Sequence, residues 1–136
     1  MKRTNARIMA MIVLYNYDIT KEINIKSLEE MIGSDFNYDE EFATTLVAGV
    51  LDNLQDIDYL ISINLENYTI ERLSYVDRNL IRIGVYEMLK TETPINIIIN
   101  EIVEISKIFS EIDDFPSSKF NNSILDKIAK GLKNGK

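Results

Sequence analysis

The sequence predicts an all-α fold, a bundle of helices. Apolar residues recur every three or four positions along most of the chain, and the period-two alternation typical of strands is not sustained anywhere. The chain has only two prolines in 136 residues and contains no Gly/Ser-rich linker or internal repeat. A chain of this length predicts one domain, or two small subdomains that share a core.

The stretch 74–90 predicts the central helix of the bundle. On a helical projection its apolar side chains cover well over half of the circumference, which is typical of a helix surrounded by others. Ser74 followed by Asp77 indicates a capping box at its start, and Pro94 marks its end. Gly84 lies inside the apolar arc, where glycine costs up to about 1 kcal/mol relative to alanine. We therefore expect another helix to approach closely there.

Glu87 projects into the middle of this apolar arc. A buried, unpaired carboxylate is costly or becomes protonated. We therefore expect Glu87 to have a structural ion pair or hydrogen bond, with Arg7 on the first helix as the candidate partner. A catalytic role is the alternative, but no constellation of partner residues accompanies this carboxylate.

The other elements follow from periodicity and from helix start and stop signals. The uncharged stretch 8–15 is too short to span a membrane and indicates a buried first helix. A second capping box, Ser27 with Glu30, predicts the start of a short helix that ends at Gly33. The predicted helices span 4–17, 27–32, 39–55, 56–67, 74–90, 95–111 and 117–132, with a turn or half-helix at 68–72 and a turn at 113–116.

Composition excludes several classes of chemistry. The chain has no cysteine and no histidine, which removes disulfides, thiolate chemistry and the commonest general base and metal ligand. We predict no enzyme activity, no cofactor and no metal site, and Glu101 with Glu104 fits a solvated helix edge. No apolar run approaches roughly 18 residues, and no signal-peptide pattern starts the chain. These features favour a cytoplasmic protein without membrane association.

The net charge of −7 argues against broad non-specific binding to nucleic acid, but the charges are unevenly distributed. Cations gather at the two ends of the chain, at Lys2, Arg3 and Arg7 and at Lys119, Lys127, Lys130, Lys133 and Lys136. If the termini lie side by side, they form one basic face on an acidic protein. A frayed N-terminus and a solvated lysine face explain the charges equally well.

Aromatic residues accompany these cations. Tyr15 follows the N-terminal arginines, and Phe120 follows Lys119. Single-stranded RNA is held by rings that stack on its bases, beside cations that contact its phosphates. A place in the core explains each ring taken singly, but the combination with two basic termini indicates an RNA-binding surface. This interpretation requires Arg3 and Phe120 to lie together.

A series of short motifs, in order along nearly the whole chain, resembles the NusB family of transcription antitermination factors. The matching residues are Arg7, Leu14-Tyr15, Phe42, Leu46, Gly49-Val50, Ile57-Asp58, Ile61, Arg72-Leu73, Asp77-Arg78, Leu80-Ile81-Arg82-Ile83, Tyr86-Glu87, Pro94, Ile99-Asn100-Glu101, Val103-Glu104, Lys107, Phe109, Lys119-Phe120, Asn122 and Leu125-Asp126-Lys127. The resemblance implies a NusB-like bundle of about seven helices in one RNA-binding domain, with packed subdomains at roughly 1–67 and 68–136. It also implies an adaptor that binds the single-stranded boxA element of ribosomal RNA transcripts with the ribosomal protein NusE. That complex lets RNA polymerase read through terminators.

Carried over by position, the resemblance implies two surfaces. The RNA-binding residues would be Lys2, Arg3, Arg7, Tyr15, Lys119, Phe120 and Asn122. The residues that face NusE would be Asp77, Arg78 and Arg82. Asp77 has an equal claim as a cap residue.

Departures from the family pattern bear on affinity. Thr4 and Asn5 stand where family members often carry arginines, and Tyr68 replaces a common Trp. Fewer cations predict a flatter salt dependence and weak RNA affinity until NusE contributes charge and area. Three alternatives stay open: an adaptor without RNA contact, a relative of the accessory domain of RNA cytosine methyltransferases, and a hidden enzyme. A homodimer is also compatible with the sequence.

Overall fold

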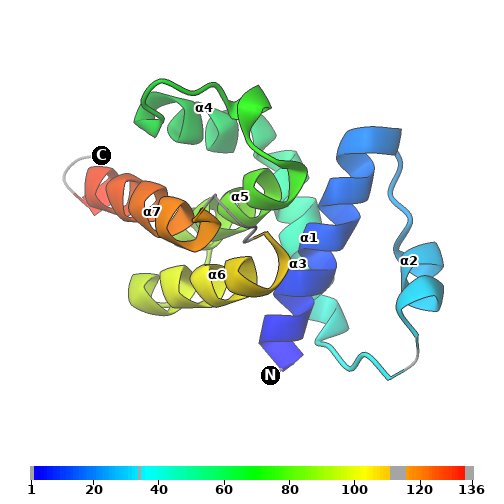
Figure 1. Cartoon of the computed structure of the whole chain (residues 1–136). Coiled ribbons are helices and arrows are strands. Elements are labelled where there is room, and N and C mark those ends of the chain that lie inside the picture. Colours follow the sequence, from blue (N-terminus) through cyan, green and yellow to red (C-terminus); the bar gives the residue numbers. More distant parts are fainter. Residues whose placement is uncertain (1, 34, 111–115, 134–136) are drawn as a thin grey trace.

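The computed structural model describes residues 2–33, 35–110 and 116–133, which form seven α-helices and one 3-10 turn without a strand (Figure 1). The predicted all-α class is confirmed. The elements are α1 (Lys2–Thr20), α2 (Ile25–Ile32), α3 (Glu40–Asp52), α4 (Leu54–Asn64), η1 (Ile70–Arg72), α5 (Tyr75–Lys90), α6 (Ile95–Phe109) and α7 (Ser117–Lys133). The helix ends differ from the predicted ones by a few residues. The predicted end of the sixth helix at Glu111 and most of the predicted turn 113–116 lie outside the described residues.

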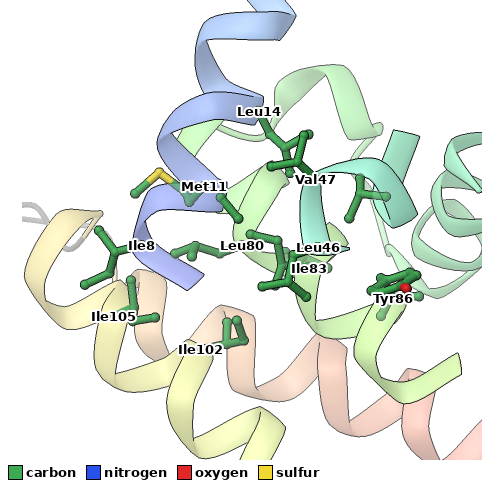
Figure 2. Packing of buried hydrophobic residues seen from close by; sticks show 14 of the residues in the cluster. Ile8, Met11, Leu14, Leu46, Val47, Leu80, Ile83, Tyr86, Ile102 and Ile105 are labelled. Carbon is green, nitrogen blue, oxygen red and sulfur yellow. The ribbon is translucent and has the colours of Figure 1, made fainter. Parts of the chain in front are cut away.

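Helix α5 is the centre of the bundle, as predicted. It packs against α1, α3, α4, α6 and α7, and its residues Leu80, Ile81, Ile83 and Val85 are completely buried. Figure 2 shows side chains of α1, α3 and α6 meeting those of α5 in one apolar core. Each burial of this kind stabilises the fold by about 1.5–3 kcal/mol, so α5 holds the other helices in place.

Side-chain caps start two helices where the sequence predicts them. The Ser74 hydroxyl accepts a hydrogen bond from the Asp77 backbone N–H at 3.0 Å, and the Asp39 carboxylate accepts one from the Phe42 backbone N–H at 3.0 Å. A cap of this kind is worth about 1 kcal/mol. These bonds fix the first turns of α5 and α3.

The capping box predicted for the second helix is wrong. α2 begins at Ile25, after Asn24, so Ser27 lies inside the first turn. The other end agrees with the prediction, because Gly33 follows the helix with a positive φ of 105°. Glycine adopts this backbone conformation at little cost.

Two glycines permit close contact between helices. A Cβ placed on Gly84 would lie 3.0 Å from Leu125 Cδ2 and 3.4 Å from Ile102 Cγ1, so α6 and α7 approach α5 there, as predicted. A Cβ placed on Gly49 would lie 2.2 Å from two ring carbons of Tyr86, well inside contact distance. The Tyr86 ring of α5 therefore packs directly on the α3 backbone.

Candidate nucleic-acid interface

Arg7 and Glu87 form a buried ion pair between α1 and α5. Arg7 Nε and Nη2 donate to the two Glu87 oxygens at 2.6 and 2.8 Å, and Arg7 Nη1 donates to Glu101 Oε1 at 3.3 Å. The side chains of Arg7 and Glu87 are 3% and 0% exposed. This is the partner that the sequence predicts for Glu87. It corrects the prediction of Arg7 as an RNA contact, because a covered guanidinium held by two carboxylates does not face solvent.

The first turn of α1 carries the exposed cations Lys2 and Arg3, and we call these two residues the basic turn. The guanidinium carbon of Arg3 lies 4.0 Å from the centre of the Phe42 ring, and Arg3 Nε is 4.0 Å from Asp39. A cavity of about 490 Å³ beside Arg3 is also lined by Glu92. Carboxylates this close reduce the positive potential, so the basic turn attracts phosphate less than two isolated cations would.

Phe120 lies in the first turn of α7 and contacts Tyr68 edge to face. The two ring centres are 5.9 Å apart and the ring planes meet at 65°. The guanidinium carbon of Arg72, in η1, is 5.9 Å from the centre of the Tyr68 ring. Lys119 and Asn122 are exposed on either side of the half-buried Phe120. Rings beside cations are the combination that binds single-stranded RNA.

Tyr15 of α1 meets Tyr75 at the start of α5, with ring centres 5.7 Å apart. The guanidinium carbon of Arg78 lies 4.9 Å from the centre of the Tyr75 ring. We call the group Tyr15, Tyr68, Tyr75, Phe120, Arg72, Arg78 and Lys119 the aromatic end. Among the described residues, its three cations take part in none of the ion pairs. The cations of the aromatic end are therefore not held in ion pairs within the described part of the chain.

The basic turn and the aromatic end lie at opposite ends of α5. Arg7, which pairs with Glu87, lies one helical turn after Arg3 in α1. Glu87 is near the C-terminal end of α5. Asn121 of α7 donates instead to Asp77, near the N-terminal end of α5. At about 1.5 Å of rise per residue, these two carboxylates are about 15 Å apart along the helix. The prediction that Arg3 and Phe120 lie together is therefore wrong, because α1 runs antiparallel to α5.

A buried hydrogen-bond network ties the start of α7 to α5 and α6. Asp77 is 3% exposed, and its carboxylate accepts from Ser117 Oγ at 3.1 Å and from Asn121 Nδ2 at 3.0 Å. Ser117 Oγ is also 3.0 Å from the Ser110 carbonyl, and Asn121 Nδ2 is 2.8 Å from Ser106 Oγ. Asp77 is largely covered by α7, and its contact with NusE stays a prediction. The network orients the turn that carries the aromatic ring of α7.

Arg82 is also interior, at 7% exposed. Its Nε and Nη2 donate to Asp58 at 2.8 Å each, and its Nη1 donates to Asp18 at 3.2 Å. Burial lowers the pKa of Arg82, but the hydrogen bonds and charges of Asp58 and Asp18 more than offset it, so the pKa is raised. Arg82 therefore ties α5 to α1 and α4, which corrects its predicted place on the partner surface. Arg78, which is half-buried, is the predicted partner residue that reaches solvent.

The sequence does not predict a functional role for Arg72 or Tyr75, and Tyr68 is only a departure from the family pattern. The contact between Tyr68 and Arg72 could have been found from the sequence, because the two residues are four positions apart. Their link to Phe120, far along the chain, comes only from folding.

Two kinds of feature are absent from the described ranges. No helix there is both long enough and apolar enough to cross a membrane. No group of three or more Asp or Glu side chains there is placed to hold a metal ion.

The sequence profile of the NusB family matches residues 4–130. The transcription antitermination protein NusB of Bacillus cereus (strain B4264) is 41% identical over 129 residues, which cover 94% of this chain and 97% of the relative. A solved structure of NusB from T. maritima has a TM-score of 0.79 at 34% identity, over 96% of this chain and 92% of that one. A structure of the antitermination factors NusB and NusE in complex with dsRNA has a TM-score of 0.75 at 31% identity, over 94% of this chain and 96% of that one. With matches of this identity along nearly its whole length, the chain belongs to the NusB family.

Proposed function

We propose that this protein is a cytoplasmic transcription antitermination factor that binds single-stranded boxA RNA of ribosomal RNA operons together with the ribosomal protein NusE. In this role it acts within the RNA polymerase complex and promotes read-through of terminators. The function named for the B. cereus relative supports the antitermination role. The solved assembly of related NusB with NusE and dsRNA supports the two kinds of partner.

The observation that carries the proposal is the aromatic end. Tyr68 is 41% exposed and contacts the ring of Phe120. The guanidinium carbon of Arg72 lies 5.9 Å from the centre of the Tyr68 ring, and the exposed Lys119 directly precedes Phe120 in α7. Stacking of a base on such a ring contributes about 1–3 kcal/mol, and cations at this distance can contact the adjoining phosphates. Rings and cations at one place therefore suit an unpaired RNA strand.

The basic turn adds a second, electrostatic contact in this proposal. The proposed RNA contacts are Lys2, Arg3, Tyr15, Lys119, Phe120 and Asn122, and Arg7 acts only by fixing α1. At a net charge of −7 the protein binds RNA weakly alone. NusE strengthens binding by adding cations and contact area, and we place its contact near Arg78.

The test is a titration of fluorescently labelled boxA RNA with the protein, with and without NusE, followed by anisotropy. We expect weak binding alone and tighter binding with NusE. The double variant Arg3→Ala/Phe120→Ala should weaken binding without changing helicity by circular dichroism. Lys130→Ala/Tyr59→Ala is the matched control, since it removes the same kinds of group from exposed positions of α7 and α4. Unaltered binding by the first variant would reject the site, and no RNA binding with NusE would reject the function.

A protein-interaction adaptor with little RNA affinity is the second candidate. The carboxylates around Arg3 and the net charge of −7 favour it. The same titration separates the two, because the adaptor would bind NusE and leave boxA RNA free. Analytical ultracentrifugation of the protein alone would show whether a homodimer forms and whether NusE dissociates it.

A further inference from the structure

An open cavity of about 290 Å³ lies at the N-terminal end of α5, next to the aromatic end. Its lining includes Tyr68, Arg72, Leu73, Asp77, Ser110 and Ser117. These residues come from the segment before α5, from α5 itself, and from the ends of α6 and α7 that face each other. The cavity is thus built from several elements whose positions are fixed by packing.

The walls of this cavity suit a flat ring. Tyr68 contributes an aromatic ring to the lining, and Leu73 contributes an aliphatic side chain. The ring of Tyr68 is supported by its edge contact with Phe120. Aromatic and aliphatic walls of this kind bind the π-face of an unstacked base.

A largely buried carboxylate, that of Asp77, forms part of the cavity lining. Asp77 is 3% exposed and accepts two hydrogen bonds, from Ser117 and from Asn121. An ionised carboxylate has about four acceptor positions, so Asp77 can accept more bonds. Both of its donors are neutral, and Asp77 takes part in none of the ion pairs among the described residues. Its remaining acceptor capacity therefore suits a donor that enters the cavity.

An exposed cation, Arg72, also forms part of the cavity lining. Its guanidinium lies over the Tyr68 ring. A guanidinium there can bind the phosphate of a nucleotide whose base is inside. A protein side chain such as Lys or Arg would also satisfy the carboxylate, but the like charge of Arg72 would repel it. The combination favours a nucleotide.

We propose that this cavity is a base-recognition subsite, which takes one unstacked RNA base that carries an exocyclic amino group. The base lies against Tyr68, its amino group donates to Asp77, and Arg72 holds its phosphate. Adenine, cytosine and guanine carry such a group and uracil does not, so the subsite discriminates against uracil. This inference rests on the proposed function, and it adds a source of base preference to it.

The test removes one amino group at a time from boxA RNA bound to the full chain with NusE. Purine riboside replaces adenosine, inosine replaces guanosine, and 2-pyrimidinone riboside replaces cytidine, and affinity is measured by competition anisotropy. We expect one position at which the loss is about tenfold, the size of a lost base-edge hydrogen bond. The other positions should change little.

Protein variants assign that position to the cavity. Tyr68→Ala should abolish the sensitivity to the amino group, Tyr68→Phe should retain it, and Tyr59→Ala is the matched control on α4. Asp77→Asn replaces one acceptor by a donor, so it should shift the preference at that position toward a base with a carbonyl group, such as uracil. Tyr68 is largely exposed, so its variants test the inference even if Asp77→Asn does not fold.

Several outcomes would overturn the inference and leave the proposed function intact. One is tight RNA binding that no amino-group removal weakens. Another is a sensitive position that Tyr68→Ala leaves unchanged. A third is a pair of results: the Tyr68→Ala protein binds NusE poorly without RNA, and no amino-group removal changes the RNA affinity. The cavity would then belong to a protein contact. Failure of the wild-type protein to bind any boxA RNA with NusE would instead overturn the proposed function, and this inference with it.

Discussion

The two ends of α5 hold buried carboxylates in different ways. Near the C-terminal end, both oxygens of Glu87 are matched by the Arg7 guanidinium. Near the N-terminal end, Asp77 accepts from a hydroxyl and an amide and lines a cavity. A matched charge pair leaves little for a ligand to bind, whereas a carboxylate held by neutral donors keeps acceptor capacity. The difference separates a structural tie from a candidate recognition site.

The surfaces near these two carboxylates also differ in what they can bind. The basic turn offers two cations in acidic surroundings. Such cations suit a phosphate contact that does not depend on the RNA sequence. The aromatic end offers rings, cations and a cavity, which suit an unstacked base. We infer that one end contributes mainly affinity and the other mainly base preference.

Glu87→Ala should have the largest effect, because it leaves the Arg7 guanidinium buried without its main partner. We expect the free energy of unfolding to fall by about 3–5 kcal/mol, measured by urea denaturation. The double variant Arg7→Met/Glu87→Leu removes both charges and keeps apolar volume, so it should lose much less. If the double variant is destabilised as much as the single one, the ion pair is not the cause.

Gly49→Ala should come next, because its methyl group would overlap the Tyr86 ring at 2.2 Å. We expect a loss of about 2 kcal/mol from overpacking, read from the thermal midpoint. Gly84→Ala is the comparison, since its nearest contact is 3.0 Å from the end of a leucine side chain. There the gain in helix propensity of about 1 kcal/mol should offset most of the strain. Equal losses would contradict this account of the two contacts.

Phe120→Ala should weaken boxA binding about tenfold in the presence of NusE, the effect of losing one stacked base. Its free energy of unfolding should change less than that of Glu87→Ala, because Phe120 is only half-buried. Competition anisotropy measures the affinity, with Tyr59→Ala as the control for loss of an exposed ring. A Phe120→Ala protein that binds like wild type would remove the ring from the interface.

Glu92→Gln should have the smallest effect and the opposite sign. Glu92 lines both cavities beside Arg3, so its neutralisation should raise the potential of the basic turn and tighten RNA binding up to about fivefold at low salt. Glu30→Gln makes the same charge change at an exposed position of α2. An equal gain from both variants would show an effect of net charge alone.

Much of the fold could be predicted because it depends on local patterns. The wide apolar arc of 74–90 identified the central helix, and Glu87 inside that arc identified a buried pair with Arg7. The start of the second helix could not be fixed, because Ser27 and Asn24 are both good cap residues and backbone geometry decides between them.

The candidate site was only partly predictable, because it depends on how helices pack. The sequence placed cations and rings at both termini, but it did not give the antiparallel packing of α1 on α5 that separates Arg3 from Phe120. Nor did it indicate that Tyr68 would meet Phe120 across a long stretch of chain. Burial of Arg82 between two carboxylates likewise depends on where α1 and α4 lie.

The most direct test of the division between the two ends is the salt dependence of boxA binding with NusE for wild type, Lys2→Ala/Arg3→Ala and Phe120→Ala. We expect the first variant to flatten the slope of log affinity against log salt by about 0.7 for each lost phosphate contact and to keep the base preference. Phe120→Ala should keep the slope and lose part of the base preference. If both variants change slope and preference alike, the two ends are one site and the account is contradicted.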